Sequence, residues 1–149
     1  MKHPHEPLVL DTNIVVQWLR GKAGAERLRA DYDLGGRRPR PVLPVVVKGE
    51  ILSFARQNGW GTAKMDRLHA LVAELPVADI SSEAVIDAYA VLDELSIRAG
   101  RRMEKNDLWI AAVARVLGAV LLTTDGDFEV LHPGMIRVER LDALTLSQT

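Results

Sequence analysis

Four acidic residues that are far apart in the sequence each stand next to an apolar segment: Asp11, Glu50, Asp107 and Asp125. If the fold gathers them, two carboxylates about 4 Å apart repel each other by roughly 4 kcal/mol at an effective dielectric constant near 20. Such a cluster is tolerable only with bound protons or a cation. Carboxylate oxygens are hard ligands, and the chain offers neither cysteine nor a local histidine pair, which favours Mg²⁺ or Mn²⁺. These ions commonly act on phosphate esters.

Each of these acids also has an ordinary structural interpretation. Asp11 could cap the helix that follows it, and Asn106 or Asp107 could cap a later one. Asp125 and Asp127 could be turn residues, and the remaining acid could lie on a solvated helix face. The combination is what favours chemistry, because two acids end apolar strands, two begin or lie on apolar helices, and no other acids share these settings.

Short apolar runs alternate with segments of helical spacing along the chain. The runs predict strands over residues 8–10, 42–45, 76–80, 119–122 and 136–141. The spacing predicts helices around residues 14–19, 23–34, 50–55, 65–75, 85–95 and 108–117. Strands that alternate with helices imply parallel pairing through right-handed crossovers. The expected fold is an α/β three-layer sandwich, a central, mostly parallel sheet with helices on both faces.

The strand ends give the acids a common place in this fold. Ligand sites in such sheets form at the carboxyl ends of the strands. Asp11 and Asp125 each follow an apolar strand, so we expect both at that edge of the sheet.

Two of the expected helices carry more specific signals. Ser82 is placed to cap a helix whose buried face is expected to comprise five apolar residues: Val85, Ala88, Val91, Leu92 and Leu95. The segment 108–117 is apolar almost all round and ends at Gly118, which predicts a helix buried inside the fold.

Length and composition fit one globular domain over residues 1–149, with a core from about 8 to 141. Hydrophobic residues make up 48% of the chain and charged residues 26%, which excludes long disorder. The chain has no cysteine, no run of the roughly 18 apolar residues that a membrane span needs, and no apolar signal segment at its start. We therefore expect a cytoplasmic protein.

Two basic groups stand out although the formal net charge is only −1. The first comprises Arg37, Arg38 and Arg40, and the second comprises Arg98, Arg101, Arg102 and Lys105. For an isolated group the ordinary interpretation is a solvated loop or helix end. The second group differs because it runs directly into Asn106 and Asp107. His3 and His5 are expected to belong to a mobile N-terminal tail.

Three segments around the acids form a recognisable set. They read Leu-Val-Leu-Asp-Thr-Asn over 8–13, Asn-Asp-Leu-Trp-Ile-Ala-Ala over 106–112 and Leu-Thr-Thr-Asp-Gly-Asp-Phe over 122–128. In order and spacing they resemble the opening motif and the paired closing motifs of PIN-domain ribonucleases, in particular of VapC-like toxins of type II toxin–antitoxin systems. The resemblance extends from about Leu8 to about Leu141. The segment before Glu50 departs from the small or threonine-rich sequence usual in the family.

The resemblance implies roles for individual residues. Asp11, Glu50, Asp107 and Asp125 would bind the metal and carry catalysis. Asn13 would orient Asp11, and either Thr123 or Thr124 would offer a hydroxyl to the site. Asp127 would brace the loop or hold metal-bound water.

It also implies an activity and partners. The activity would be Mg²⁺- or Mn²⁺-dependent endonucleolytic cleavage of RNA by an activated water, leaving a 3′-hydroxyl and a 5′-phosphate. At least one of Arg98, Arg101, Arg102 and Lys105 would contact the RNA backbone. The partners would be a cognate VapB-like antitoxin and a second copy of the chain in a homodimer.

Three other classes compete with this interpretation. A haloacid-dehalogenase phosphatase needs a second acid two residues after the first, and position 13 is Asn. A phosphoryl-accepting receiver domain needs a late lysine in the sheet, and residues 119–124 contain none. The third is a non-catalytic PIN-fold module that binds RNA or protein, whose usual mark is loss of the acids.

Overall fold

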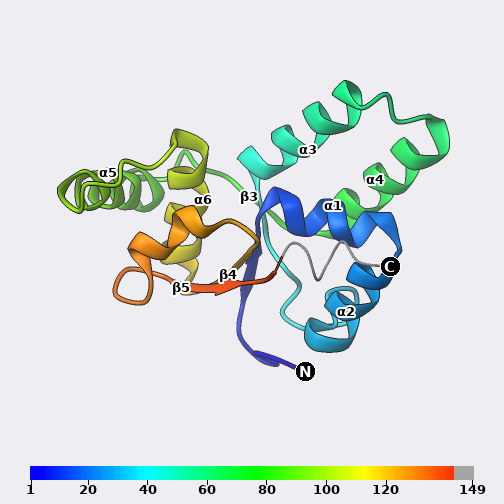
Figure 1. Ribbon diagram of the computed structural model, residues 1–149, viewed down its shortest axis with the longest axis horizontal. Coiled ribbons are helices and arrows are strands. Elements are labelled where there is room, and N and C mark those ends of the chain that lie inside the picture. The colour runs from blue at the N-terminus through cyan, green and yellow to red at the C-terminus, as the bar shows by residue number, and fades with distance from the viewer. Residues whose placement is uncertain (143–149) are drawn as a thin grey trace.

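A computed structural model describes residues 1–142 (Figure 1). The first half of the chain forms β1 (Leu8–Leu10), α1 (Thr12–Arg20), α2 (Ala23–Tyr32), β2 (Leu43–Pro44), α3 (Val45–Gln57), α4 (Thr62–Glu74) and β3 (Val77–Ala78). The second half forms α5 (Glu83–Arg98), α6 (Lys105–Leu117), β4 (Val120–Thr123), a 3₁₀ helix η1 (Gly126–Leu131) and β5 (Arg137–Arg140).

The strands form a parallel sheet in two sections. One section has the order β1-β4-β5 and the other pairs β2 with β3. A parallel bridge between Val9 and Val42 joins them. Helices α1 to α4 lie on one side in Figure 1, with α5 and α6 on the other, and α6 packs against β1, β2 and β4. The predicted α/β architecture is confirmed.

Two predicted strands are shorter than expected. Leu43 and Pro44 alone pair with β3, and Val45 already begins α3, so the expected strand over 42–45 is wrong at its end. Proline has no N–H for a ladder hydrogen bond, so the pairing cannot continue through Pro44. The strand expected over 76–80 is likewise reduced to Val77 and Ala78, the length that β2 can pair.

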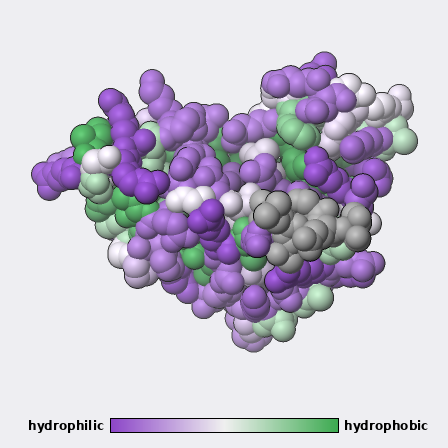
Figure 2. Space-filling view, in the orientation of Figure 1, coloured by the Kyte–Doolittle hydropathy of each residue, from purple (hydrophilic) through white to green (hydrophobic). Residues whose placement is uncertain are grey.

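Helices α5 and α6 confirm most but not all of their predicted burial. The Ser82 hydroxyl caps α5 by accepting a hydrogen bond from the Val85 N–H. Val91 was expected on the buried face but is 47% exposed, because it lies one residue, or about 100°, from Leu92 at the centre of that face. In α6, Val116 and Leu117 are also exposed, so the last turn of this helix is not buried as predicted. Apolar side chains consequently gather over α5 on the left of Figure 2.

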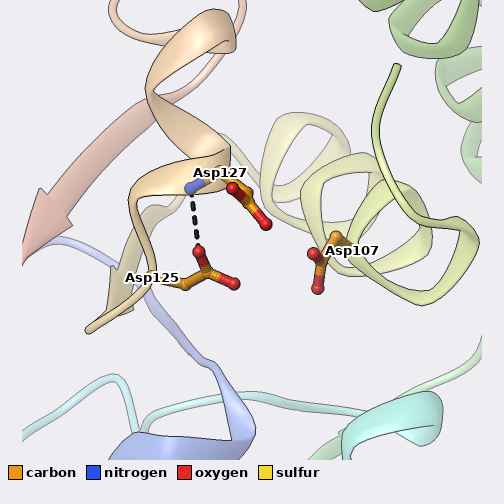
Figure 3. Close-up of side chains that lie close together, drawn as sticks. All are labelled: Asp107, Asp125 and Asp127. Atoms are coloured by element: carbon orange, nitrogen blue, oxygen red, sulfur yellow. Dashed lines mark hydrogen bonds between the residues drawn. The ribbon is translucent and has the colours of Figure 1, made fainter. Parts of the chain in front are cut away.

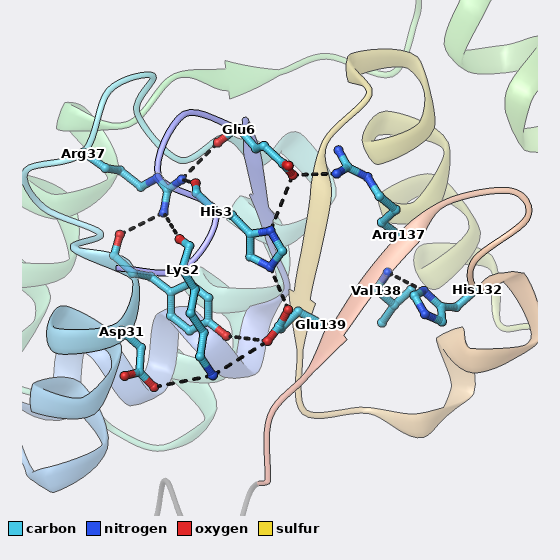
Figure 4. A network of polar contacts seen from close by, with 10 residues as sticks. Lys2, His3, Glu6, Asp31, Arg37, His132, Arg137, Val138 and Glu139 are labelled. Carbon is cyan, nitrogen blue, oxygen red and sulfur yellow. Dashed lines mark hydrogen bonds and ion pairs between the residues drawn. The ribbon is translucent and has the colours of Figure 1, made fainter.

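The N-terminal segment is fixed to the body of the protein, contrary to the expectation of a mobile tail (Figure 4). Arg37 was expected in a solvated loop but is only 2% exposed. Its guanidinium donates hydrogen bonds to the main-chain carbonyls of Tyr32 (2.8 Å), Glu6 (3.0 Å) and His3. The His3 ring in turn hydrogen-bonds the Glu139 carboxylate on β5 (2.8 Å). The buried guanidinium thus supplies donors to carbonyls at the end of α2 and in the N-terminal segment.

The buried apolar side chains form one continuous core that runs from Leu8 to Ile136. Among residues 1–142, no helix has both the length and the apolar character needed to cross a membrane.

Candidate active site

The structure brings the strand ends and the start of α6 together. β1 and β4 are parallel neighbours with Leu10 opposite Leu122, so Asp11 and Asp125 follow strands that end at the same edge. Asp107 lies in the first turn of α6, where it faces Asp125 and is near enough to Asp11 for the charge of Asp11 to raise its pKa. Carboxylate oxygens of Asp107, Asp125 and Asp127 lie within 4.8 Å of one another (Figure 3).

Asp11 is buried, with 6% of its surface exposed. Its Oδ1 accepts a hydrogen bond from the Thr12 N–H (2.8 Å), and its Oδ2 accepts one from the Thr123 hydroxyl (2.7 Å). Burial raises the pKa of Asp11, the two hydrogen bonds oppose the rise, and the charge of Asp125 adds to it. Asp11 therefore caps α1, as its structural interpretation predicted, and its charge also acts on Asp107.

Thr123 connects two of the acids. Its hydroxyl donates to Asp11 and accepts a hydrogen bond from the Asp125 N–H (2.9 Å). The side chain of Asn13 was expected to orient Asp11 but instead donates to the Thr124 hydroxyl (3.3 Å). Thr12 and Thr123 therefore orient Asp11, because each of them hydrogen-bonds one of its two carboxylate oxygens.

Asp107 is half-buried and is surrounded by like charge. Burial first, and then the charges of Asp11, Asp125, Glu104 and Glu50, raise the pKa of Asp107 to about 7. Its predicted alternative as a helix cap is wrong, because α6 is capped by Glu104. The Glu104 carboxylate accepts hydrogen bonds from the N–H groups of Asn106 (3.1 Å) and Asp107 (3.3 Å).

Glu104 is a contributor to the site that the sequence analysis missed. Its position three residues before Asp107 was a possible signal, since a cap accepts from the N–H groups two and three residues later. Glutamate is not a preferred capping residue, so the signal is weak. Glu104 places a further negative charge beside Asp107 and Glu50.

Asp125 and Asp127 lie on the loop after β4. The Asp127 N–H donates to Asp125 Oδ1 (2.8 Å), which caps η1 and confirms the turn interpretation of Asp125. The main chain of Asp127 therefore braces the loop, as expected. Its exposed carboxylate also lies in the group with Asp107 and Asp125, where Figure 3 shows it directed into the shared space.

Glu50 lies on α3, outside this group of three carboxylates. It accepts a hydrogen bond from the Thr12 hydroxyl (3.2 Å), and the Asn106 side chain also bonds to it. Burial raises the pKa of Glu50, and the charges of Asp11 and Glu104 add to the rise. The structure thus connects all four predicted acids, with Glu50 at one side.

The donor set of this site fits a hard divalent cation. Within residues 1–142, no cation contributes to the pKa shifts of Asp11, Glu50 or Asp107. These three carboxylates therefore experience mainly like charge, whereas the Arg140 guanidinium lies against Gly126, the residue between Asp125 and Asp127. Oxygen atoms alone, with negative charge in excess, are the ligands that Mg²⁺ and Mn²⁺ prefer.

The acid site has a groove on its α3 side and exposed cations on its α6 side. Figure 2 shows the outline of the molecule hollowed between the side of α5 and α6 and the side of α3 and α4. An open groove of about 610 Å³ lies along α3 next to Glu50. The predicted cations Arg98, Arg101, Arg102 and Lys105 are all exposed, and Arg98 also forms an ion pair with Glu94 (2.7 Å).

A family model described as the PIN domain matches residues 8–132. The chain belongs to the PIN domain family, which confirms the resemblance seen in the three sequence segments. No curated protein sequence matches the chain.

Solved structures place the fold among VapC-type chains. A chain of VapBC2 from Rickettsia felis, bound to a promoter DNA fragment, is 20% identical, with a TM-score of 0.72 over 91% of this chain and 99% of the other. A chain of VapBC-5 from Mycobacterium tuberculosis is 26% identical, with a TM-score of 0.68 and the same coverage. VapC20 of M. tuberculosis, a sarcin-ricin loop-cleaving toxin, is 20% identical, with a TM-score of 0.62 over 87% of this chain and 98% of VapC20.

Proposed function

We propose that the protein is a Mg²⁺- or Mn²⁺-dependent endoribonuclease that acts as the toxin of a toxin–antitoxin pair. The observation that carries the proposal is the meeting of the Asp107, Asp125 and Asp127 carboxylates, with Asp11 and Glu50 near enough for their charges to raise the pKa of Asp107. A non-catalytic PIN-fold module would have no need to keep carboxylates in this unfavourable arrangement.

The site residues would have different roles in the reaction. Asp11, Asp107 and Asp125 would hold the ion, and Glu50 would hold a second ion or position the attacking water. A bound divalent ion supplies positive charge for the phosphate and makes water more acidic. Thr12 and Thr123 keep the Asp11 oxygens in fixed directions, and the Asp127 N–H does the same for Asp125. This fixed geometry is what in-line attack on a phosphodiester requires.

Support for the toxin role comes from the similar structures. The VapBC2 and VapBC-5 structures belong to toxin–antitoxin systems, and VapC20 is described as a toxin that cleaves an RNA loop. We infer a VapB-like antitoxin as partner, an RNA substrate and a cytoplasmic location. The exposed apolar side chains of α5, namely Ile86, Val91 and Ile97, offer surface for association, including the expected homodimer.

Incubation of the purified protein with structured RNA tests the nuclease activity. Cleavage should require added Mg²⁺ or Mn²⁺ and stop in excess chelator, with products that carry 5′-phosphates. Undiminished cleavage in chelator would exclude the metal mechanism. Light scattering of the protein at micromolar concentration, alone and with its co-expressed neighbouring gene product, tests the association.

A further inference from the structure

The groove beside Glu50 continues directly from the acid site. Thr12 and Glu50 belong to both, because they line the groove and hydrogen-bond each other at the edge of the acid cluster. Ser53 and Gln57 continue the lining along one face of α3, and Asn106 closes it from the start of α6. Its volume of about 610 Å³ is within the usual range of small-ligand sites.

The lining of this groove suits a flat, uncharged, polar group. Glu50 is its single charged residue, and it would repel a phosphate. The Phe54 ring forms part of the wall and meets the Trp60 ring edge to face, with centroids 6.0 Å apart, which holds it in one orientation. An aromatic ring fixed in this way offers a surface on which a nucleobase can stack.

Two polar groups in the wall have hydrogen-bonding capacity left over. The Gln57 side-chain N–H donates to the Ser53 hydroxyl oxygen (2.9 Å), which fixes the amide. In the part of the chain that the structure describes, the Gln57 side-chain carbonyl and the Ser53 hydroxyl hydrogen have no partner. An acceptor and a donor thus lie side by side, as base edges require.

Phosphates have a different place to bind. The exposed cations Arg101, Arg102 and Lys105 come directly before Asn106 in the chain, at the α6 side of the site. An RNA backbone that followed these cations past the acids would therefore have the groove of α3, whose lining contains no cation, on its other side.

We propose that the groove along α3 is a subsite for one unpaired nucleobase, located next to the phosphate that is cut. The inference rests on the proposed ribonuclease function and specifies its substrate as RNA with an unstacked base at the cleavage position. A base within a duplex cannot enter, because its edge and both faces are occupied.

The first test compares cleavage preferences. The parent, Gln57→Ala, Ser53→Ala and the matched control Gln17→Ala are given single-stranded RNA with randomised positions, and the cut ends are sequenced. Gln17 lies on α1 and does not line the groove. We expect the base preference at one position beside the cut to fall by about three- to tenfold in the two groove variants and to persist in the control. Unchanged preferences in both groove variants would overturn the subsite.

The second test measures binding without cleavage, so that failure of the subsite is separated from failure of the nuclease. In an Asp107→Asn background, fluorescence anisotropy with short labelled single-stranded RNA should show binding weakened about fivefold or more by Phe54→Leu. Thermal melting checks that this variant is folded. NMR signals of the Gln57 side-chain amide should shift on adding RNA and stay unchanged with duplex RNA of the same sequence.

The outcomes are distinct. Binding in the groove without metal-dependent cleavage by the parent would reject the nuclease and retain the subsite. Cleavage with no effect of Phe54, Ser53 or Gln57 would reject the subsite and retain the nuclease. Protection of the groove by a peptide of the antitoxin, with no shift on adding RNA, would assign it to protein binding and overturn the proposal.

Discussion

Two clusters of charged side chains in this protein have opposite electrostatic character. In the N-terminal network, burial alone would raise the pKa of Glu139, but hydrogen bonds from His3 and Tyr32 and the charge of Lys2 hold that pKa below its usual range. In the acid site, every charge that acts on Asp107 has the same sign as its own carboxylate, and its pKa rises to about 7.

The difference suggests that the charges of the N-terminal network stabilise the fold, whereas those of the acid site serve to bind a cation. Carboxylates in the N-terminal network meet donors and cations, so the network joins the first residues, α2 and β5 and stabilises the fold. Carboxylates in the acid site meet hydrogen-bond donors from threonines, Asn106 and the main chain, and no cation contributes to the pKa shifts of Asp11, Glu50 or Asp107, so their charge remains available to an external cation. Substitutions in the acid site should therefore reduce activity and preserve or raise stability, while substitutions in the N-terminal network should mainly reduce stability.

The largest expected effect is on cleavage by Asp107→Asn. Loss of one anionic ligand should reduce metal-dependent cleavage by about 100-fold or more. Even mutation of a residue that only hydrogen-bonds a metal ligand typically lowers metal affinity or activity by about 10- to 100-fold. The melting temperature without metal should hold or rise, because a repelled, half-buried charge is removed. Equal cleavage by Asp107→Asn, Asp107→Ala and the parent would mean that Asp107 is not a catalytic ligand.

A large effect on stability is expected from Arg37→Met. The variant leaves buried carbonyl groups without donors, which should lower the free energy of unfolding by about 2–4 kcal/mol. Arg38→Met is the matched control, because Arg38 is exposed, and it should change stability by less than about 0.5 kcal/mol. Urea unfolding measures both. Similar stability of the two variants would contradict the role given to the buried guanidinium.

A smaller loss of activity is expected from Thr123→Val, which keeps the shape of the side chain and removes the hydroxyl between Asp11 and Asp125. Cleavage should fall about tenfold, because the Asp11 carboxylate loses one of its two fixed directions. The Mg²⁺ concentration that gives the half-maximal rate should be higher in this variant than in the parent. A rate loss without any change in metal dependence would assign Thr123 to folding alone.

The smallest expected effect is the pH dependence of stability in chelator. The pKa of Asp107 is raised to about 7 in the folded protein from 3.8, so the folded protein retains a proton that the unfolded chain loses between these values. Stability should fall as the pH rises through this window, and Asp107→Asn should reduce the fall. Glu139 acts in the opposite direction, since its lowered pKa adds stability above pH 4.5 that is lost on acidification. Urea unfolding at pH 5.5 and 8 would contradict this account if the two proteins changed equally.

The sequence predicted those features that depend on local pattern. The parallel α/β order, the Ser82 cap and the acids at the strand ends all followed from apolar spacing and residue type. Prediction from the sequence failed where the environment of a residue depends on contacts with residues far away in the chain. The burial of Arg37 depends on carbonyl groups of Glu6 and Tyr32, and no periodicity indicates that these segments meet.

Within the site, residue types were predictable and individual contacts were not. The four acids converge as the motifs indicated, but Asn13 bonds Thr124 and Glu104 replaces Asp107 as the cap of α6. Both outcomes depend on side-chain directions at the start of a helix, which residue type and spacing do not specify.

The hydrogen bond between Thr123 and Asp11 joins residues 112 positions apart in the chain. A contact of such long sequence separation forms only after the intervening polypeptide has been made. During synthesis, β1 leaves the ribosome long before β4, so the nascent chain contains Asp11 without its partners. The acid site is completed when β4 pairs beside β1, so the proposed activity would depend on the finished fold.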